Sequence, residues 1–182
     1  GCTIMALTES HLYTMARGKS NMKINDLVGV ARAMEEPTFV VVNAKNKELS
    51  TVKKMIKRAQ KKPISVAIAS IGGTEHIGMY SYSKAANIPF KAVSFGSGAQ
   101  SLQALASGKV EASLLNPSEA AALIADKKIK AIVLLHDKAL ADYPKVKTSY
   151  SMGHKVKVVT TRGYAVLKGT PQSVIDEISK GM

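Results

Sequence analysis

Small and hydroxyl-bearing residues gather at three points in the middle of the sequence, and their chemistry suits the binding of an anion. The segments are Ser70-Ile71-Gly72-Gly73-Thr74, Gly96-Ser97-Gly98-Ala99 and Asn116-Pro117-Ser118. Each follows an apolar run and precedes a helical pattern, so each places backbone N–H groups at a helix start, where negative charge is favoured. Taken singly, each is equally well explained as a turn that caps a helix. Together, at successive strand ends, they predict one shared binding edge.

Residues that would support catalysis or metal binding do not form a set. His11, His76, His136 and His154 are far apart, and none has the spacing of a zinc site. Cys2 is the only cysteine, which excludes an internal disulfide. A lone cysteine near the start of a sequence is a candidate site for a lipid anchor. Because a strand is predicted directly after it, at residues 3–7, a small core residue is the favoured interpretation. No phosphate-binding or dinucleotide-binding glycine motif is present. We therefore expect binding without catalysis, metal or cofactor.

The elements that must position these segments are short apolar runs alternating with helical patterns. Strands are predicted at residues 3–7, 38–42, 65–70, 91–94, 112–115, 129–135, 156–160 and 164–167. Helices are predicted at residues 49–61, 75–86, 99–107, 117–125 and 171–179. The alternation of strand and helix over residues 65–135 predicts an α/β fold with a parallel or mixed sheet. In such sheets ligands sit beside the carboxyl ends of the strands.

Charge is concentrated in one stretch of the chain. The 182 residues carry 26 Lys and Arg against 13 Asp and Glu, a net charge of +13. Residues 45–62 hold a dense group of lysines with Glu48 as the only acid, and an apolar residue every three or four positions predicts an amphipathic helix that ends before Pro63. Its basic face is either solvated or binds phosphates, as in nucleic acid. With aromatics at only 5% and no DNA-binding motif, the solvated face is favoured.

Composition sets the class of protein. Hydrophobic residues make up 46% of the chain, enough for a core in one large domain or two small ones. Disorder and a disulfide scaffold are excluded. The longest apolar runs, at residues 39–42 and 131–135, are far too short to cross a bilayer.

A series of weak motifs runs in a fixed order along almost the whole chain. They lie at residues 1–4, 26–32, 39–43, 66–76, 93–98, 108–111, 126–131, 143–148 and 169–171. Their order and spacing resemble those of the substrate-binding receptors of tripartite tricarboxylate transporters, also called Bug proteins. No single motif is very specific, so the resemblance depends on the series as a whole.

The resemblance implies a fold and a division of the chain. The expected fold is α/β, of the periplasmic-binding-protein type II-like two-domain kind, in which two domains joined by crossing strands close on a ligand. Domain 2 is expected to be intact at residues 44–157. Domain 1 is expected at residues 1–43 and 158–182 and to be incomplete, because family members carry further segments before and after these. The chain is therefore expected to be a fragment that lacks both ends.

The resemblance also implies a set of ligand-binding residues. Family ligands are small carboxylates, held largely by backbone N–H groups, hydroxyls and water. Mapped onto this sequence, the carboxylate-contacting loop is Ser70, Gly72, Gly73 and Thr74, with Gly98 and Asn116 completing the domain 2 side and Thr8 lining the domain 1 side.

Three residues depart from the family pattern. Gly96 stands where many members carry Lys, and Ser94 stands where they carry Pro, which we expect to loosen that loop. Glu75 lies in the first helical turn, where it suits the helix dipole but would repel an anionic ligand, so we expect it to face outward.

The function that follows from the resemblance is that of a non-enzymatic solute-binding receptor. It would capture a small carboxylate in the periplasm or another extracytoplasmic compartment, either free or lipid-anchored in the full-length protein, and deliver it to membrane permease subunits. Nucleic acid is not an expected partner under this hypothesis. The alternative is a small-molecule sensor or a nucleic-acid-binding module that uses the basic helix at residues 45–62.

Overall fold

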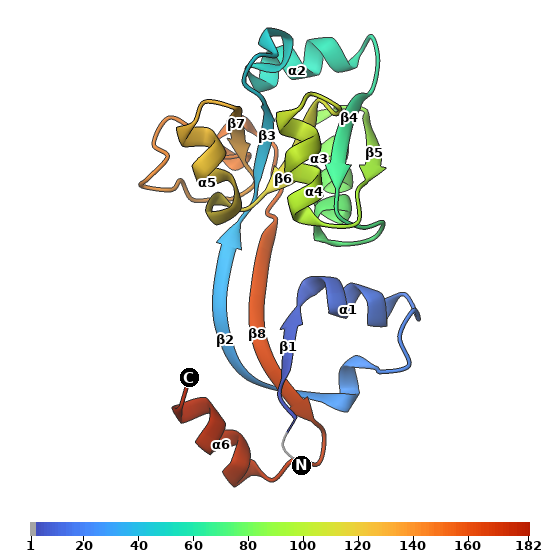
Figure 1. The fold of residues 1–182 in the computed structure, drawn as a ribbon, viewed down its shortest axis with the longest axis vertical. Coiled ribbons are helices and arrows are strands. Elements are labelled where there is room, and N and C mark those ends of the chain that lie inside the picture. Colours follow the sequence, from blue (N-terminus) through green and yellow to red (C-terminus); the bar gives the residue numbers. More distant parts are fainter. Residues whose placement is uncertain (1–2) are drawn as a thin grey trace. The chain divides into compact units, whose positions relative to one another are not determined.

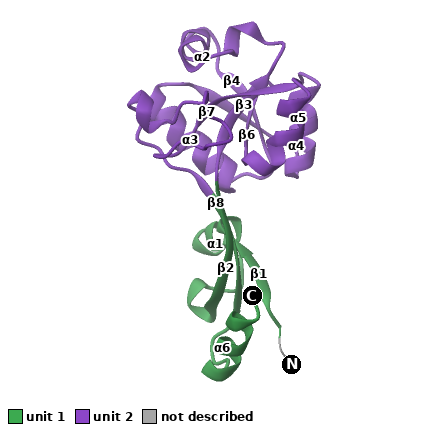
Figure 2. Cartoon of the chain, turned by 90° about the vertical axis from the view of Figure 1, so that its left-hand side faces the viewer, with its two compact units in different colours: residues 1–36, 160–182 green, residues 37–159 purple. Residues whose placement is uncertain are grey.

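The computed structural model describes residues 3–182, which form two compact units (Figure 2). Unit 1 combines the chain up to Glu36 with Thr160–Met182, and unit 2 comprises Pro37–Val159. The predicted division was placed after residue 43 and before residue 158. The compact unit 2 begins earlier, because the strand at Phe39–Asn43 pairs within its sheet. Cys2 lies outside the described residues.

Unit 2 is built on a five-stranded mixed sheet (Figure 1). Its strands are β3 (Phe39–Asn43), β4 (Ile64–Ile68), β5 (Phe90–Ser94), β6 (Ala112–Leu115) and β7 (Ile129–Leu134), in the order β5-β4-β6-β3-β7. Strand β4 is parallel to both β5 and β6, whereas β3 runs antiparallel to β6 and β7. The predicted mixed α/β sheet is confirmed.

Both faces of this sheet are buried, which explains the continuous apolar runs of its strands. Alternate side chains of β3 enter two different core clusters, with Val40 and Val42 on one face and Phe39 and Val41 on the other. Helices α2 (Val52–Ala59) and α3 (Thr74–Ala86) supply side chains to the first cluster. Helices α4 (Gly98–Ala106) and α5 (Pro117–Ala125) supply the second. The sheet is therefore held rigidly between two helical layers.

Unit 1 has a three-stranded sheet in the order β1-β8-β2. Its elements are β1 (Met5–Thr8), α1 (Glu9–Ala16), β2 (Leu27–Pro37), β8 (Val159–Leu167) and α6 (Gln172–Lys180). Helix α1 and strand β2 were not predicted, because neither has a regular apolar period. Strand β8 was predicted as two pieces, and Gly163 between them is instead a regular strand residue opposite Leu7.

No helix among residues 3–182 combines the length and the apolar character that a membrane crossing requires.

Candidate functional site

The three predicted segments lie at one edge of the unit 2 sheet. They follow β4, β5 and β6, which are neighbours in the sheet and run parallel, so their carboxyl ends meet at the same edge. Each segment leads directly into a helix, α3, α4 or α5. The prediction that Ser70, Gly72, Gly73, Thr74, Gly98 and Asn116 follow successive strand ends of one sheet is therefore confirmed, and this edge of unit 2 is called the ligand edge below.

The loop after β4 is held by its own hydrogen bonds. Gly72 adopts a φ of +79°, which favours glycine, and its N–H donates to Nδ1 of His76 at 2.9 Å. The N–H of Gly73 donates to the carbonyl oxygen of Ser70 at 3.2 Å. A Cβ at Gly73 would lie only 2.7 Å from the Ser70 hydroxyl oxygen, so the loop is tightly wound. Thr74, the first residue of α3, is buried.

The loop after β5 is tied to the end of β4. The hydroxyl of Ser94 and the N–H of Gly96 both donate to the carbonyl oxygen of Ala69, at 3.1 and 3.0 Å. Two hydrogen bonds thus anchor the segment that contains Ser94 and Gly96 to the end of β4. Ser97 caps α4 by accepting the N–H of Gln100 at 3.2 Å, and this leaves Gly98 as the first residue of the helix.

The segment after β6 forms a capping box. The N–H of Asn116 donates to Oε2 of Glu119 at 3.2 Å, and the Asn116 side chain accepts the backbone N–H of that residue. The buried Asn116 amide also donates to the carbonyl oxygen of Pro37 at 3.1 Å. A Cβ at Gly98 would lie 3.8 Å from Oε1 of Glu119. The starts of α4 and α5 therefore lie close together.

Two carboxylates lie at the ligand edge, and one of them was predicted to point elsewhere. Glu75 is half-buried, and its Oε2 is 3.5 Å from the position of a Cβ at Gly73. Burial raises the pKa of the Glu75 carboxyl, and the negative charge of Glu119 adds to the rise, while the hydrogen bond from its own backbone N–H opposes it. The expectation that Glu75 faces outward is wrong, because the carboxylate folds back over the start of its own helix.

Sequence reasoning also missed His76 and Glu119. The short sequence distance between each residue and its partner could have revealed both contacts. His76 lies four residues after Gly72, and Glu119 lies three residues after the helix-capping Asn116. The hydrogen bond from Gly72 requires the Nδ1 atom of His76 to be unprotonated.

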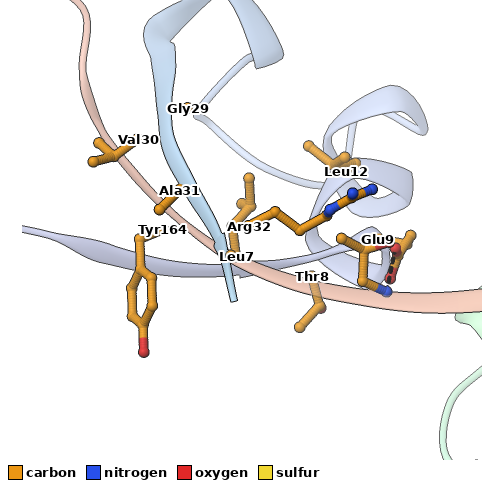
Figure 3. A pocket seen from close by; sticks show the side chains of 11 residues that line it. Leu7, Thr8, Glu9, Leu12, Gly29, Val30, Ala31, Arg32 and Tyr164 are labelled. Carbon is orange, nitrogen blue, oxygen red and sulfur yellow. Dashed lines mark hydrogen bonds between the residues drawn. The ribbon is translucent and has the colours of Figure 1, made fainter. Parts of the chain in front are cut away.

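Thr8 belongs to unit 1, where it ends β1 and caps α1. Its backbone N–H and hydroxyl both lie 3.1 Å from Nδ1 of His11. Thr8 lines a cavity of about 350 Å³ between β1, α1, β2 and β8. Figure 3 shows the Arg32 side chain extending toward Glu9 and Leu12 in this cavity. The cavity therefore offers a hydroxyl, a carboxylate and a guanidinium beside apolar walls.

Residues 3–182 contain no group of three or more His, Cys, Asp or Glu side chains placed to hold a metal ion.

Three solved structures share the fold of this chain. MatC from Rhodopseudomonas palustris with bound malate is 18% identical, with a TM-score of 0.85 over 96% of this chain and 61% of its own. A second R. palustris protein, with adipate, is 17% identical, with a TM-score of 0.86 over 97% and 60%. The periplasmic binding protein BugD is 18% identical, with a TM-score of 0.84 over 96% and 60%. This chain thus spans about three fifths of the length of these proteins.

Comparison with curated protein sequences finds no match. A family model described as "Tripartite tricarboxylate transporter family receptor" matches residues 1–182. This match agrees with the motif series and with the α/β fold that the solved structures above share. The chain belongs to the TctC family of tripartite tricarboxylate transporter receptors.

Proposed function

We propose that the protein is a solute-binding receptor for a small carboxylate. The observation that carries the proposal is the ligand edge, where three parallel strands in succession each deliver a helix start beside small and hydroxyl residues. Structures of the same fold hold malate and adipate, which are both dicarboxylates. A carboxylate needs N–H and O–H donors, and this edge supplies both kinds.

The proposed ligand residues act mainly through the backbone. Gly72 and Gly73 carry no side chains of their own, so the backbone of the loop after β4 would be the part that meets the ligand. Ser70 and Thr74 add hydroxyl donors at the same loop. Gly98 leaves the start of α4 open, and Asn116 positions the start of α5 through its capping box. In unit 1, Thr8 would contact the ligand from its cavity.

The wider setting is part of the same proposal. The receptor would act in the periplasm or another extracytoplasmic compartment, would catalyse no reaction and would deliver its ligand to membrane permease subunits. Domains corresponding to residues 44–157, and to residues 1–43 with 158–182, would close on the ligand. Membership of the transporter receptor family supports this setting.

The test is a thermal-shift panel of mono-, di- and tricarboxylates on the protein and on Thr74→Ala. A dicarboxylate at about a hundred times its Kd should add about 2.7 kcal/mol of stability to the wild type. Removing the Thr74 hydroxyl should weaken binding roughly tenfold to a hundredfold, since one hydrogen bond to a charged group is lost.

Thr51→Ala is the matched control, because Thr51 caps α2 in the same unit and lies outside the ligand edge. It should lower stability without changing carboxylate affinity. If no carboxylate shifts the melting temperature, or if Thr74→Ala binds as tightly as the wild type, the proposed site is refuted.

A further inference from the structure

A second concave surface lies on unit 2 at α2 and the turn before it. The groove has a volume of about 530 Å³ and is lined by one acid, Glu48, and by Lys47, Lys54, Lys57, Arg58, Lys61 and Lys62. These six basic residues are called the basic groove below. None of them follows β4, β5 or β6 at the ligand edge, so the groove is a separate feature.

The fold fixes the basic groove by burying the other side of α2. Val52, Met55 and Ala59 lie in the core, and the side chain of Thr51 caps the helix by accepting the N–H of Lys54. Lys57, Lys61 and Lys62 are exposed. The apolar side chains are therefore already covered by the protein, and the free face of the helix offers charge rather than an apolar surface.

One cation of the groove is held in place by acids. Arg58 forms an ion pair with Glu111, donates to the carbonyl oxygen of Lys62 at 2.7 Å and lies 3.8 Å from Glu48. Glu111 is itself fixed by the N–H and hydroxyl of Ser65, both at 3.0 Å. Arg58 thus ties the end of α2 to the sheet, and its charge is largely neutralised.

Within residues 3–182, the lysines of the basic groove are not neutralised by acids. Lys54 donates to the hydroxyl of Ser50 at 3.1 Å and to a backbone carbonyl, both neutral groups. Among the described residues, no ion pair joins Lys47, Lys57, Lys61 or Lys62 to an acid. Like charges crowded on a short helix repel one another, and a polyanionic surface would relieve that repulsion.

The chemistry of the lining favours a surface of lipid phosphates over nucleic acid. Lysine ammonium groups are point charges that suit diffuse phosphate groups, and they bring no bidentate or stacking recognition. No aromatic side chain on which bases could stack lines the groove. We propose that the basic groove docks the protein on an anionic phospholipid surface. This proposal rests on the proposed function in one respect only: a transporter receptor works near a membrane.

The test is sedimentation with vesicles of phosphatidylcholine, with and without phosphatidylglycerol. The protein should bind the anionic vesicles, should not bind the neutral ones and should be released as salt rises. A triple variant, Lys57→Gln with Lys61→Gln and Lys62→Gln, should bind about a hundredfold more weakly, since each lysine near an anionic surface contributes roughly fivefold.

The matched control is Lys138→Gln with Lys145→Gln and Lys155→Gln, three exposed lysines of the same unit outside the groove. It has the same net charge as the groove variant and should keep most of the vesicle binding. Equal losses in the two triple variants would overturn the proposal, because net charge alone would then explain binding.

Two further measurements distinguish lipid phosphates from the phosphates of nucleic acid and from free phosphate. Tighter binding of duplex DNA than of anionic vesicles, lost in the groove variant, would overturn the proposal in favour of nucleic acid. Displacement by inorganic phosphate beyond the effect of chloride at equal ionic strength would overturn it in favour of a free anion. Carboxylate binding by the groove variant should equal that of the wild type, so failure of the receptor function would be seen independently.

Discussion

The carboxylate of Glu75 lies where a ligand carboxylate is proposed to bind, and this creates a conflict of charge. Its Oε2 is close to Gly73, and Glu119 adds a second negative charge from the start of α5. Meanwhile the N–H groups of Gly72 and Gly73 donate to His76 and Ser70. A bound carboxylate must therefore compete with groups of the protein itself at this loop.

Replacing Glu75 with Gln should strengthen binding of a dicarboxylate at neutral pH. The variant removes a like charge from the ligand edge but keeps the side-chain shape, and the gain should be roughly threefold to tenfold for charges about 6 Å apart. Titration calorimetry of the wild type, Glu75→Gln and the exposed control Glu177→Gln would measure it. Weaker binding by Glu75→Gln would show that the carboxylate assists the ligand, for example by accepting from a cationic group.

The same residue predicts a pH dependence of stability. The pKa of Glu75 is raised above its ordinary value of 4.5, so the folded state holds the proton more firmly than the unfolded state. Stability should therefore fall as pH rises from 4.5 through the raised pKa, and Glu75→Gln should remove that part of the fall. Melting temperatures of both proteins across this range would test the sign, and parallel profiles would contradict it.

At the scale of the elements, the strands of unit 2 were easier to predict than those of unit 1, because the unit 2 sheet is buried on both faces. Strands β3 to β7 and helices α3 to α5 were predicted to within two residues, because short apolar strand runs alternate with longer segments that begin after turn residues. Unit 1 was harder, because β2 carries Arg32, Glu35 and Glu36 and alternates poorly. The three loops of the ligand edge were predicted from strand order. The effect of the Glu119 charge on the pKa of Glu75 was not, because local periodicity carries no information about charges on different helices.

Packing of α3 against the sheet depends on Gly78. A Cβ there would lie 2.8 Å from Cγ1 of Val158 and 3.2 Å from Cδ2 of Leu114. Alanine gains up to about 1 kcal/mol of helix propensity over glycine, but overpacking a core costs about 1–3 kcal/mol. We expect Gly78→Ala to be destabilising by about 1 kcal/mol in urea unfolding.

Val158 offers the matched rescue. In the double variant Gly78→Ala with Val158→Ala, the two nearest methyl groups are gone, so the cost of the two changes should be less than additive. Additive losses would indicate that the helix, and not the Val158 contact, sets the cost.

On the scale of the whole molecule, the two core clusters both belong to unit 2. Unit 1 has a three-stranded sheet and the helices α1 and α6. Of the residues in these two helices, Ile175 alone is buried. Since buried apolar surface is the main source of stability, unit 2 should be the more stable unit. The ligand edge and the basic groove, both in unit 2, are thus built on the better-packed part of the chain.

Gly163 allows the division of stability between the units to be measured. A Cβ at this position would lie 2.6 Å from the carbonyl oxygen of Ala31, so Gly163→Ala must push β8 away from Ala31. We expect hydrogen exchange in β1, β2 and β8 to accelerate by about fivefold or more, as for a cost of roughly 1–3 kcal/mol. Gly29→Ala is the control, because that position has open space around it in the same unit. Exchange in β4, β5, β6 and β7 should stay unchanged in both variants, because both core clusters that hold this sheet lie within unit 2. If Gly163→Ala accelerates exchange equally in the five-stranded sheet, the chain unfolds as one cooperative body and the division fails.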